Sequence, residues 1–262
     1  GTIADMGAYP FFQIPGCIDS LATNFNEEAN INDGSCTYPD NGDYSLSFDG
    51  VDDFVETNTN IKPEQGTLIA YVDPDMSGIS DMIILDGTDA CQDFQFKVFD
   101  DRAWMHNKST ECNLSHNLSS ESILNEFQLD VLIFIWSAEG QKIYLNGILD
   151  GEHSYVGNSA SSNELYLGKN SYTGSSLYNG LMERVILFDV PLSEFSIINF
   201  DANQLDDYSD VVFDYKFNAG TGNILYDHSD NGNHGTINGA TWVENIDGCT
   251  DSLACNYDEE NP

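Results

Sequence analysis

Short β-prone segments separated by glycine-containing turn pairs fill most of the chain, and this spacing constrains the fold more than any other feature. The segments are Tyr44–Phe48, Thr67–Val72, Met82–Leu85, Phe94–Phe99, Leu129–Trp136, Lys142–Leu145, Glu164–Leu167, Arg184–Phe188 and Val211–Phe217. The turn pairs, which favour tight connections between antiparallel strands, are Asp49-Gly50, Asp86-Gly87, Glu139-Gly140, Asn146-Gly147, Asn179-Gly180 and Asn238-Gly239. Leu192–Leu205 has the spacing of a short helix, with Ser193 as its N-cap. The sequence therefore predicts an all-β fold, an antiparallel jelly-roll β-sandwich.

The acidic charge limits the class of partner. The 262 residues include 44 Asp and Glu but only 8 Lys and Arg, which gives a formal net charge of −36. Nucleic acid and anionic membrane surfaces bind basic patches, so we expect neither as a partner. Ca²⁺ prefers carboxylate and carbonyl oxygens and is the expected cofactor. Adaptation to a salty habitat would give the same bulk charge.

A thirteen-residue segment occurs twice and indicates how the chain is organised. Residues 16–28 read GCIDSLATNFNEE and residues 248–260 read GCTDSLACNYDEE, with nine identical positions. The second copy stops before the counterpart of Ala29–Cys36, so we expect the chain to belong to a longer repetitive protein. The expected division is 1–15 as the end of an upstream domain or linker, 16–38 as the first repeat, 43–246 as the jelly roll and 248–262 as the truncated repeat.

The six cysteines fall into three local pairs. The pairs are Cys17 with Cys36, Cys91 with Cys112, and Cys249 with Cys255. Local pairing without a zinc-binding CxxC pattern predicts disulfides and an extracellular or cell-surface location. Because Thr23 stands where the second copy has Cys255, we expect Cys17–Cys36 to be the basic disulfide of the repeat. The pairing of Cys249 and Cys255 stays open.

Five phrases in a fixed order carry a family resemblance. They are YSLSFDGVDDFVE at 44–56, TLIAYVDP at 67–74, IYLNG at 143–147, LYLG at 165–168 and YNGLMERVILFDVPLS at 178–193. Together they resemble the laminin-G-like, concanavalin A-like lectin/glucanase jelly rolls of secreted bacterial proteins. The resemblance implies a carbohydrate-binding or adhesion module.

The repeat is similar to thrombospondin type 3 calcium repeats and to a tandem acidic module of secreted marine bacterial proteins. This similarity implies a Ca²⁺ loop that turns sharply at Gly34, with oxygen ligands from Asp19, Asn24, Asn26, Asn30, Asn32 and Asp33. The alternative is a turn that holds itself by hydrogen bonds from side chain to backbone.

A second calcium position is implied inside the jelly roll. The D-x-S-x-N-G-N-x-G loop of related domains corresponds here to Asp227, Asn231 and Asn233, and Glu183 matches a family acid near that loop. Asp49 and Asp53 are further candidates, although Asp49-Gly50 is equally well explained as a hairpin turn.

The sequence lacks the carboxylate pattern of the related glucanases. These enzymes place paired acids on one strand as E-x-D-x-x-E or E-x-D-x-E, and glycoside hydrolysis needs two such carboxylates. The nearest segment, Glu126–Asp130, has one Glu and the wrong spacing. We therefore expect no catalysis.

Aromatic side chains in or beside loops are the candidates for sugar binding, because their faces stack on pyranose rings. The candidates are Trp104, Tyr172 and Tyr178, whereas Trp136 and Trp242 lie in apolar, strand-like settings and are expected in the core. The leading hypothesis is a non-catalytic module that binds a polysaccharide or glycan and contacts neighbouring copies or domains of the same long protein. The alternative is a structural subunit or spacer of a surface fibre without a sugar ligand.

Overall fold

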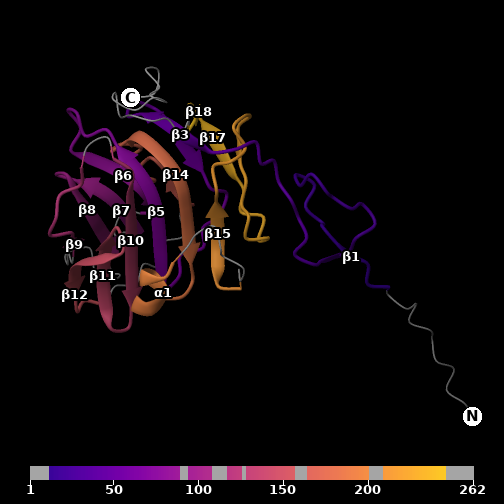
Figure 1. Ribbon diagram of the computed structural model, residues 1–262, viewed down its shortest axis with the longest axis horizontal. Helices are drawn as coiled ribbons and strands as arrows, with labels where there is room; N and C mark the ends of the chain where they lie inside the picture. The colour runs from indigo at the N-terminus through magenta and orange to yellow at the C-terminus, as the bar shows by residue number, and fades with distance from the viewer. Residues whose placement is uncertain are drawn as a thin grey trace, which may run out of the picture. The chain divides into compact units, whose positions relative to one another are not determined.

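The computed structural model describes residues 12–88, 94–107, 117–125, 128–156, 164–200 and 209–245 (Figure 1). The chain divides into two compact units, Gly1–Pro39 and Asp40–Pro262. Two of the predicted cysteine pairs, Cys91 with Cys112 and Cys249 with Cys255, lie outside the described residues.

The first unit is small and is closed by a disulfide. Strands β1 (Pro15–Gly16) and β2 (Ile31–Asn32) pair in parallel. The predicted bond between Cys17 and Cys36 is present, with a Cα–Cα distance of 4.8 Å. It closes a loop with a sequence separation of 19 residues. A bridge over a loop of this size restricts the unfolded chain enough to add about 3 kcal/mol of stability.

The second unit contains two eight-stranded antiparallel sheets, which confirms the predicted sandwich. The first sheet runs in the order β12 (Ile148–His153), β11 (Gly140–Leu145), β10 (Asp130–Ser137), β5 (Gly66–Pro74), β14 (Asn179–Phe188), β3 (Tyr44–Asp49) and β18 (Thr241–Glu244), with β15 (Val211–Tyr215) also paired to β14. The second sheet runs in the order β16 (Ile224–Leu225), β17 (Gly235–Asn238), β4 (Phe54–Glu56), β13 (Tyr166–Leu167), β6 (Asp81–Asp86), β7 (Phe94–Phe99), β8 (Arg102–Asn107) and β9 (Asn117–Ser119).

Alternate residues of the strands fill the core between the sheets, because successive side chains of a strand point to opposite faces. The Trp136 ring of β10 lies 5.4 Å from the Phe94 ring and 5.2 Å from the Phe96 ring of β7. Its indole N–H donates to the Pro63 carbonyl at 2.9 Å. Trp136 is therefore a core residue as predicted, and Trp242 is partly buried against the same core.

A second apolar cluster covers the face of the first sheet that is turned away from the second sheet, called here the outer face. It contains Ile69, Ile133, Ile135 and Ile186 from the strands, and Ile197 from helix α1 (Glu194–Ile198). Within the described residues, no helix is long and apolar enough to cross a membrane.

The structure confirms the predicted start of the helix and corrects its end. Ser193 is the N-cap, and its hydroxyl accepts from the Ser196 N–H at 3.1 Å. The helix ends at Ile198 rather than Leu205, because Asn199 caps it and its amide donates to the Phe195 carbonyl at 2.7 Å.

One predicted turn is wrong, and several short strands were not predicted. Asn179-Gly180 lies inside β14 instead of a turn. A Cβ on Gly180, which has a φ of +124°, would lie 2.2 Å from the Asp73 carbonyl oxygen, so glycine is needed for close pairing with β5. The strands missed in the sandwich are β4, β8, β9, β12, β16, β17 and β18.

Candidate functional site

The loop between β13 and β14, residues 168–178 and called here the β13–β14 loop, runs beside β6. Gly168 donates its backbone N–H to the Ile84 carbonyl at 3.2 Å, and Ile83 donates to the Ser176 carbonyl at 2.9 Å. The loop begins where β13 ends, and β13 is itself paired with β6. The strand thus provides a rigid edge on which the loop is built.

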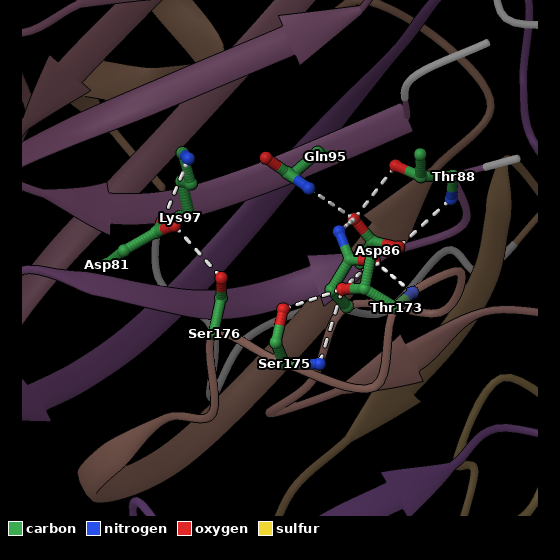
Figure 2. A network of polar contacts seen from close by, with 9 residues as sticks. Asp81, Asp86, Thr88, Gln95, Lys97, Thr173, Ser175 and Ser176 are labelled. Atoms are coloured by element: carbon green, nitrogen blue, oxygen red, sulfur yellow. Dashed lines mark hydrogen bonds and ion pairs between the residues drawn. The ribbon is translucent and has the colours of Figure 1, made fainter. Parts of the chain in front are cut away.

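A buried carboxylate at the end of β6 holds this loop (Figure 2). Asp86 is fully buried, and it lies opposite Gln95 of β7. Its donors are the Thr88 N–H (3.0 Å) and hydroxyl (2.9 Å), the Gln95 amide (2.6 Å), the Ser171 N–H (2.8 Å) and hydroxyl (2.5 Å), and the Asn170 amide (3.4 Å). A buried carboxylate is tolerated when such donors replace water, so Asp86 fixes the loop in one position.

A second carboxylate holds the other side of the loop. Asp81, at the start of β6, forms an ion pair with the Lys97 ammonium at 2.9 Å and accepts from the Ser176 hydroxyl at 2.9 Å (Figure 2). The Lys97 ammonium also lies 4.8 Å from the centre of the Phe99 ring. Both ends of β6 therefore anchor the β13–β14 loop through side chains.

The tip of the loop is closed by its own hydrogen bonds and presents an exposed aromatic ring. The Asn170 side-chain oxygen accepts from the N–H groups of Tyr172 (3.1 Å) and Thr173 (2.8 Å). Tyr172 is 61% exposed. An exposed ring on a rigid, hydroxyl-rich loop can stack on a sugar face while nearby polar groups bind the sugar hydroxyls.

Lys169, the second residue of the loop, is also fixed in place. The Lys169 ammonium lies 3.2 Å from the centre of the Phe54 ring and 4.3 Å from that of Tyr166. The Tyr166 hydroxyl donates to Glu56 at 3.2 Å, and burial together with the charge of Glu56 raises the pKa of Tyr166 to about 12. Cation–π contacts of this kind further restrict the loop.

The two other predicted sugar-binding aromatics have different surroundings. Trp104 of β8 is partly buried and packs against Phe99, with 5.2 Å between ring centres. Tyr178 is fully buried: its ring packs on Phe48 at 5.6 Å, and its hydroxyl donates to the Leu181 carbonyl at 3.1 Å. The prediction for Tyr178 is wrong, because its ring faces the core and leaves no surface for a sugar.

The predicted calcium ligands of the first repeat all accept backbone N–H groups of the same unit. Four of them close turns two residues long, whereas Asn24 and Asn30 accept from N–H groups 13 and 16 residues away. The side-chain oxygens of Asp19, Asn24, Asn26, Asn30, Asn32 and Asp33 accept backbone N–H groups of Leu21, Thr37, Glu28, Ile14, Gly34 and Ser35, respectively. This is the arrangement that the alternative interpretation, a turn held by its own side chains, describes. Calcium binding by the repeat stays a prediction.

The loop that begins at Asp227 is likewise held by hydrogen bonds. The buried Asp227 carboxylate accepts from the Asp214 N–H (2.9 Å), the Ser229 N–H and hydroxyl (both 2.9 Å) and the Asn233 N–H (3.0 Å). The amides of Asn231 and Asn233 donate to the Val212 carbonyl at 3.2 and 2.7 Å. Two donors on each oxygen of Asp227 account for its lone pairs without an ion.

Glu183 does not share these hydrogen bonds. Its acidic neighbours are Asp43 and Asp73, and burial together with their charges raises its pKa to about 7. The structure therefore does not join Glu183 to the Asp227 loop in one ligand set.

A third acidic group lies in the turn between β3 and β4. It consists of Asp49, Asp52 and Asp53, whose carboxylate oxygens lie within 4.8 Å of one another. Among the described residues, this is the group of acidic, histidine or cysteine side chains close enough to share a metal ion. Asp53 is 7% exposed, and burial together with the neighbouring acids raises its pKa. From the sequence, Asp49 and Asp53 were named as candidate ligands but Asp52 was not. The adjacent pair Asp52-Asp53 could have indicated that Asp52 belongs to the same group.

The two packed antiparallel sheets define a jelly-roll β-sandwich. The chain belongs to the Laminin_G_3 family of the concanavalin A-like lectin/glucanases superfamily, whose family model matches residues 48–198. The family resemblance found in the sequence is thereby confirmed for the jelly roll. Comparison with curated protein sequences found no match.

Three of the solved structures with the same fold come from bacterial proteins. A Bacteroides ovatus protein to which carbohydrate binding has been attributed is 16% identical with a TM-score of 0.60, over 84% of this chain and 65% of its own. The chain thus spans less than two thirds of that protein. The CBM40 domain of the Ruminococcus gnavus IT-sialidase is 14% identical with a TM-score of 0.51, over 59% of this chain and 95% of its own. The Streptococcus pneumoniae NanB sialidase is 14% identical with a TM-score of 0.50, over 60% of this chain and 28% of its own.

Proposed function

We propose that the chain is a non-catalytic carbohydrate-binding module and that Tyr172 is the ring on which the sugar stacks. The observation that carries this proposal is an exposed aromatic side chain on a loop that the buried Asp86 carboxylate holds in place. A ring fixed before binding loses little conformational entropy when a sugar docks on it. The disulfide between Cys17 and Cys36 supports binding outside the cell, because such bonds persist in oxidising compartments.

The relatives support the same function. The Ruminococcus gnavus domain is a carbohydrate-binding module of a sialidase, and the Bacteroides ovatus protein carries the same attribution. The paired-carboxylate strand motif of the glucanase branch does not occur in the sequence, which supports binding without hydrolysis.

The test is a glycan array probed with the protein and with Tyr172→Ala. We expect saturable binding to one class of glycan and a loss of about tenfold or more in Tyr172→Ala, because one stacking aromatic contributes about 1–2 kcal/mol to such a complex. Phe195→Ala is the matched control, since Phe195 is 78% exposed on α1, away from the loop. Equal binding by the protein and Tyr172→Ala would show that the sugar sits elsewhere.

We also propose that Ca²⁺ binds at the Asp49, Asp52 and Asp53 cluster. Asp49 and Asp53 each use one oxygen to accept backbone N–H groups of their own turn, at 2.8–3.3 Å. Within the described residues their other oxygens, and both of Asp52, accept no hydrogen bond. Three carboxylates with free oxygens fit a hard cation, which would relieve the repulsion among them.

Thermal unfolding with and without a chelator tests the ion. We expect added Ca²⁺ to raise the melting midpoint, because a ligand at about 100 times its Kd stabilises by about 2.7 kcal/mol. Asp52→Asn should abolish this rise, whereas Asp33→Asn in the repeat should leave the rise of the jelly roll intact. If the melting midpoint of Asp52→Asn still rises with Ca²⁺, the ion binds at another position. If the midpoint of the wild type does not change, the proposal that the chain binds Ca²⁺ is wrong.

A further inference from the structure

A cavity of about 680 Å³ opens on the outer face of the first sheet, on the opposite sheet from the β13–β14 loop. Its floor includes Ile135, Lys142 and Glu152, which lie in register across β10, β11 and β12. The segment 191–194, which leads into α1, forms the facing wall. This volume falls in the range of about 300–1,000 Å³ that is typical of small-ligand sites.

A tyrosine whose side chain is almost entirely buried lines the cavity. Tyr144 of β11 is 2% exposed, and its ring belongs to the apolar cluster of the outer face. Its hydroxyl has no hydrogen-bond partner among the described residues. A tyrosine O–H normally finds a partner, so the hydroxyl of this cavity-lining side chain is an open position for a ligand atom.

Carboxylates dominate the charge around that hydroxyl. Glu139, Glu152 and Glu194 line the cavity against one basic side chain, Lys142. His153 also lines the cavity, and its Nδ1 accepts the Tyr155 N–H at 2.9 Å. Burial, then the charges of Glu194 and Glu152, raises the pKa of Tyr144. The same negative field that disfavours a phenolate stabilises a cation placed beside the phenol oxygen.

We propose that this cavity is a second ligand site, which binds a primary ammonium group between the Tyr144 oxygen and the carboxylates of Glu152 and Glu194. An ammonium offers three N–H donors and no acceptor, which matches a phenol oxygen and two carboxylates. The apolar floor at Ile135 accommodates the carbon skeleton that carries the amine. The ammonium can belong to an amino sugar or to a lysine side chain, and the two sources are separated below.

Calorimetric titration of the full chain with D-glucosamine, N-acetyl-D-glucosamine and Nα-acetyl-lysine methylamide tests this site. We expect one or both amines to bind and N-acetyl-D-glucosamine, which lacks the charge, to bind at least about tenfold more weakly. Binding of glucosamine alone identifies an amino-sugar site, and binding of the lysine derivative alone identifies a lysine site.

Variants assign the binding to the cavity. The double variant Glu152→Gln/Glu194→Gln should weaken amine binding about tenfold or more, whereas Lys142→Met should strengthen it by removing a like charge. Both glutamates are exposed, so the double variant is expected to fold, and Glu244→Gln on β18 is the control. Equal binding of glucosamine and its N-acetyl form, no binding of either amine, or no effect of the double variant would overturn the proposal. None of these results depends on Tyr172.

Discussion

Two neighbouring residues on β14, Glu183 and Arg184, show how local geometry decides whether a charged side chain finds a partner of opposite charge. The pairing of β14 with β5 shifts register between Met182 and Arg184, with Glu183 as the extra residue. Arg184 forms a bidentate pair with the buried Asp214 at 3.0 and 2.8 Å. Glu183 has acidic neighbours instead, and the raised pKa of about 7 follows from burial and their charges.

This difference predicts a pH-dependent effect of Glu183→Gln. The folded-state pKa of Glu183 exceeds the ordinary glutamate value of 4.5. Between these two pH values the folded protein therefore retains a proton that the unfolded chain has lost, and its stability falls as the pH rises through this range. Above about pH 7 Glu183 is ionised in the folded protein, and the loss of stability is complete. In the presence of a chelator, Glu183→Gln should be more stable than the wild type by roughly 1 kcal/mol at pH 8 and equally stable at pH 4. The value at pH 8 is discounted for solvent screening, because the side chain is only half buried.

Urea unfolding at pH 4 and pH 8 measures this effect, with Glu139→Gln in an exposed turn as the control. A stability change of the same size at both pH values would contradict the assignment of the raised pKa.

At the scale of elements, the β13–β14 loop depends on β6 for its shape. Six donor contacts converge on Asp86, and three of them come from Asn170 and Ser171 of the loop. The charge of the carboxylate strengthens each of these hydrogen bonds. The position of the exposed Tyr172 ring is therefore set by a buried side chain.

Asp86→Asn should lower the free energy of unfolding by about 2–3 kcal/mol, because an amide has one acceptor oxygen and leaves buried donors unpaired. It should also weaken glycan binding, although Tyr172 is unchanged. Asp75→Asn is the matched control, because the Asp75 carboxylate accepts mainly from Ser77, whose N–H and hydroxyl lie at 3.0 and 2.5 Å. Full glycan affinity in folded Asp86→Asn would contradict the anchoring role.

The sequence predicts those features whose stabilising contacts join residues close together in the chain. The strands, the Ser193 N-cap and the Cys17–Cys36 bond arise from contacts that are close in sequence or from a two-residue alternation. Asp86 was predicted only as part of a turn pair, because its partner Ser171 lies 85 residues away. Tyr178 stands beside an Asn-Gly pair, and no local pattern shows that this pair lies within a strand.

At the scale of the whole second unit, the two sheets carry different candidate sites. The Tyr172 loop lies beside β6 of the second sheet, and the cavity at Tyr144 lies on the outer face of the first sheet. The apolar core between the sheets separates them. If both proposals hold, the proposed glycan and the proposed ammonium group bind on opposite sheets and do not compete.

A crystal structure of the chain with a glycan selected from the array tests the central claim most directly. We predict a sugar ring stacked on Tyr172, with its hydroxyls hydrogen-bonded to the β13–β14 loop. A glycan bound away from this loop, or an array without any specific glycan, would contradict the account. The second result would instead favour a structural spacer in a longer extracellular protein.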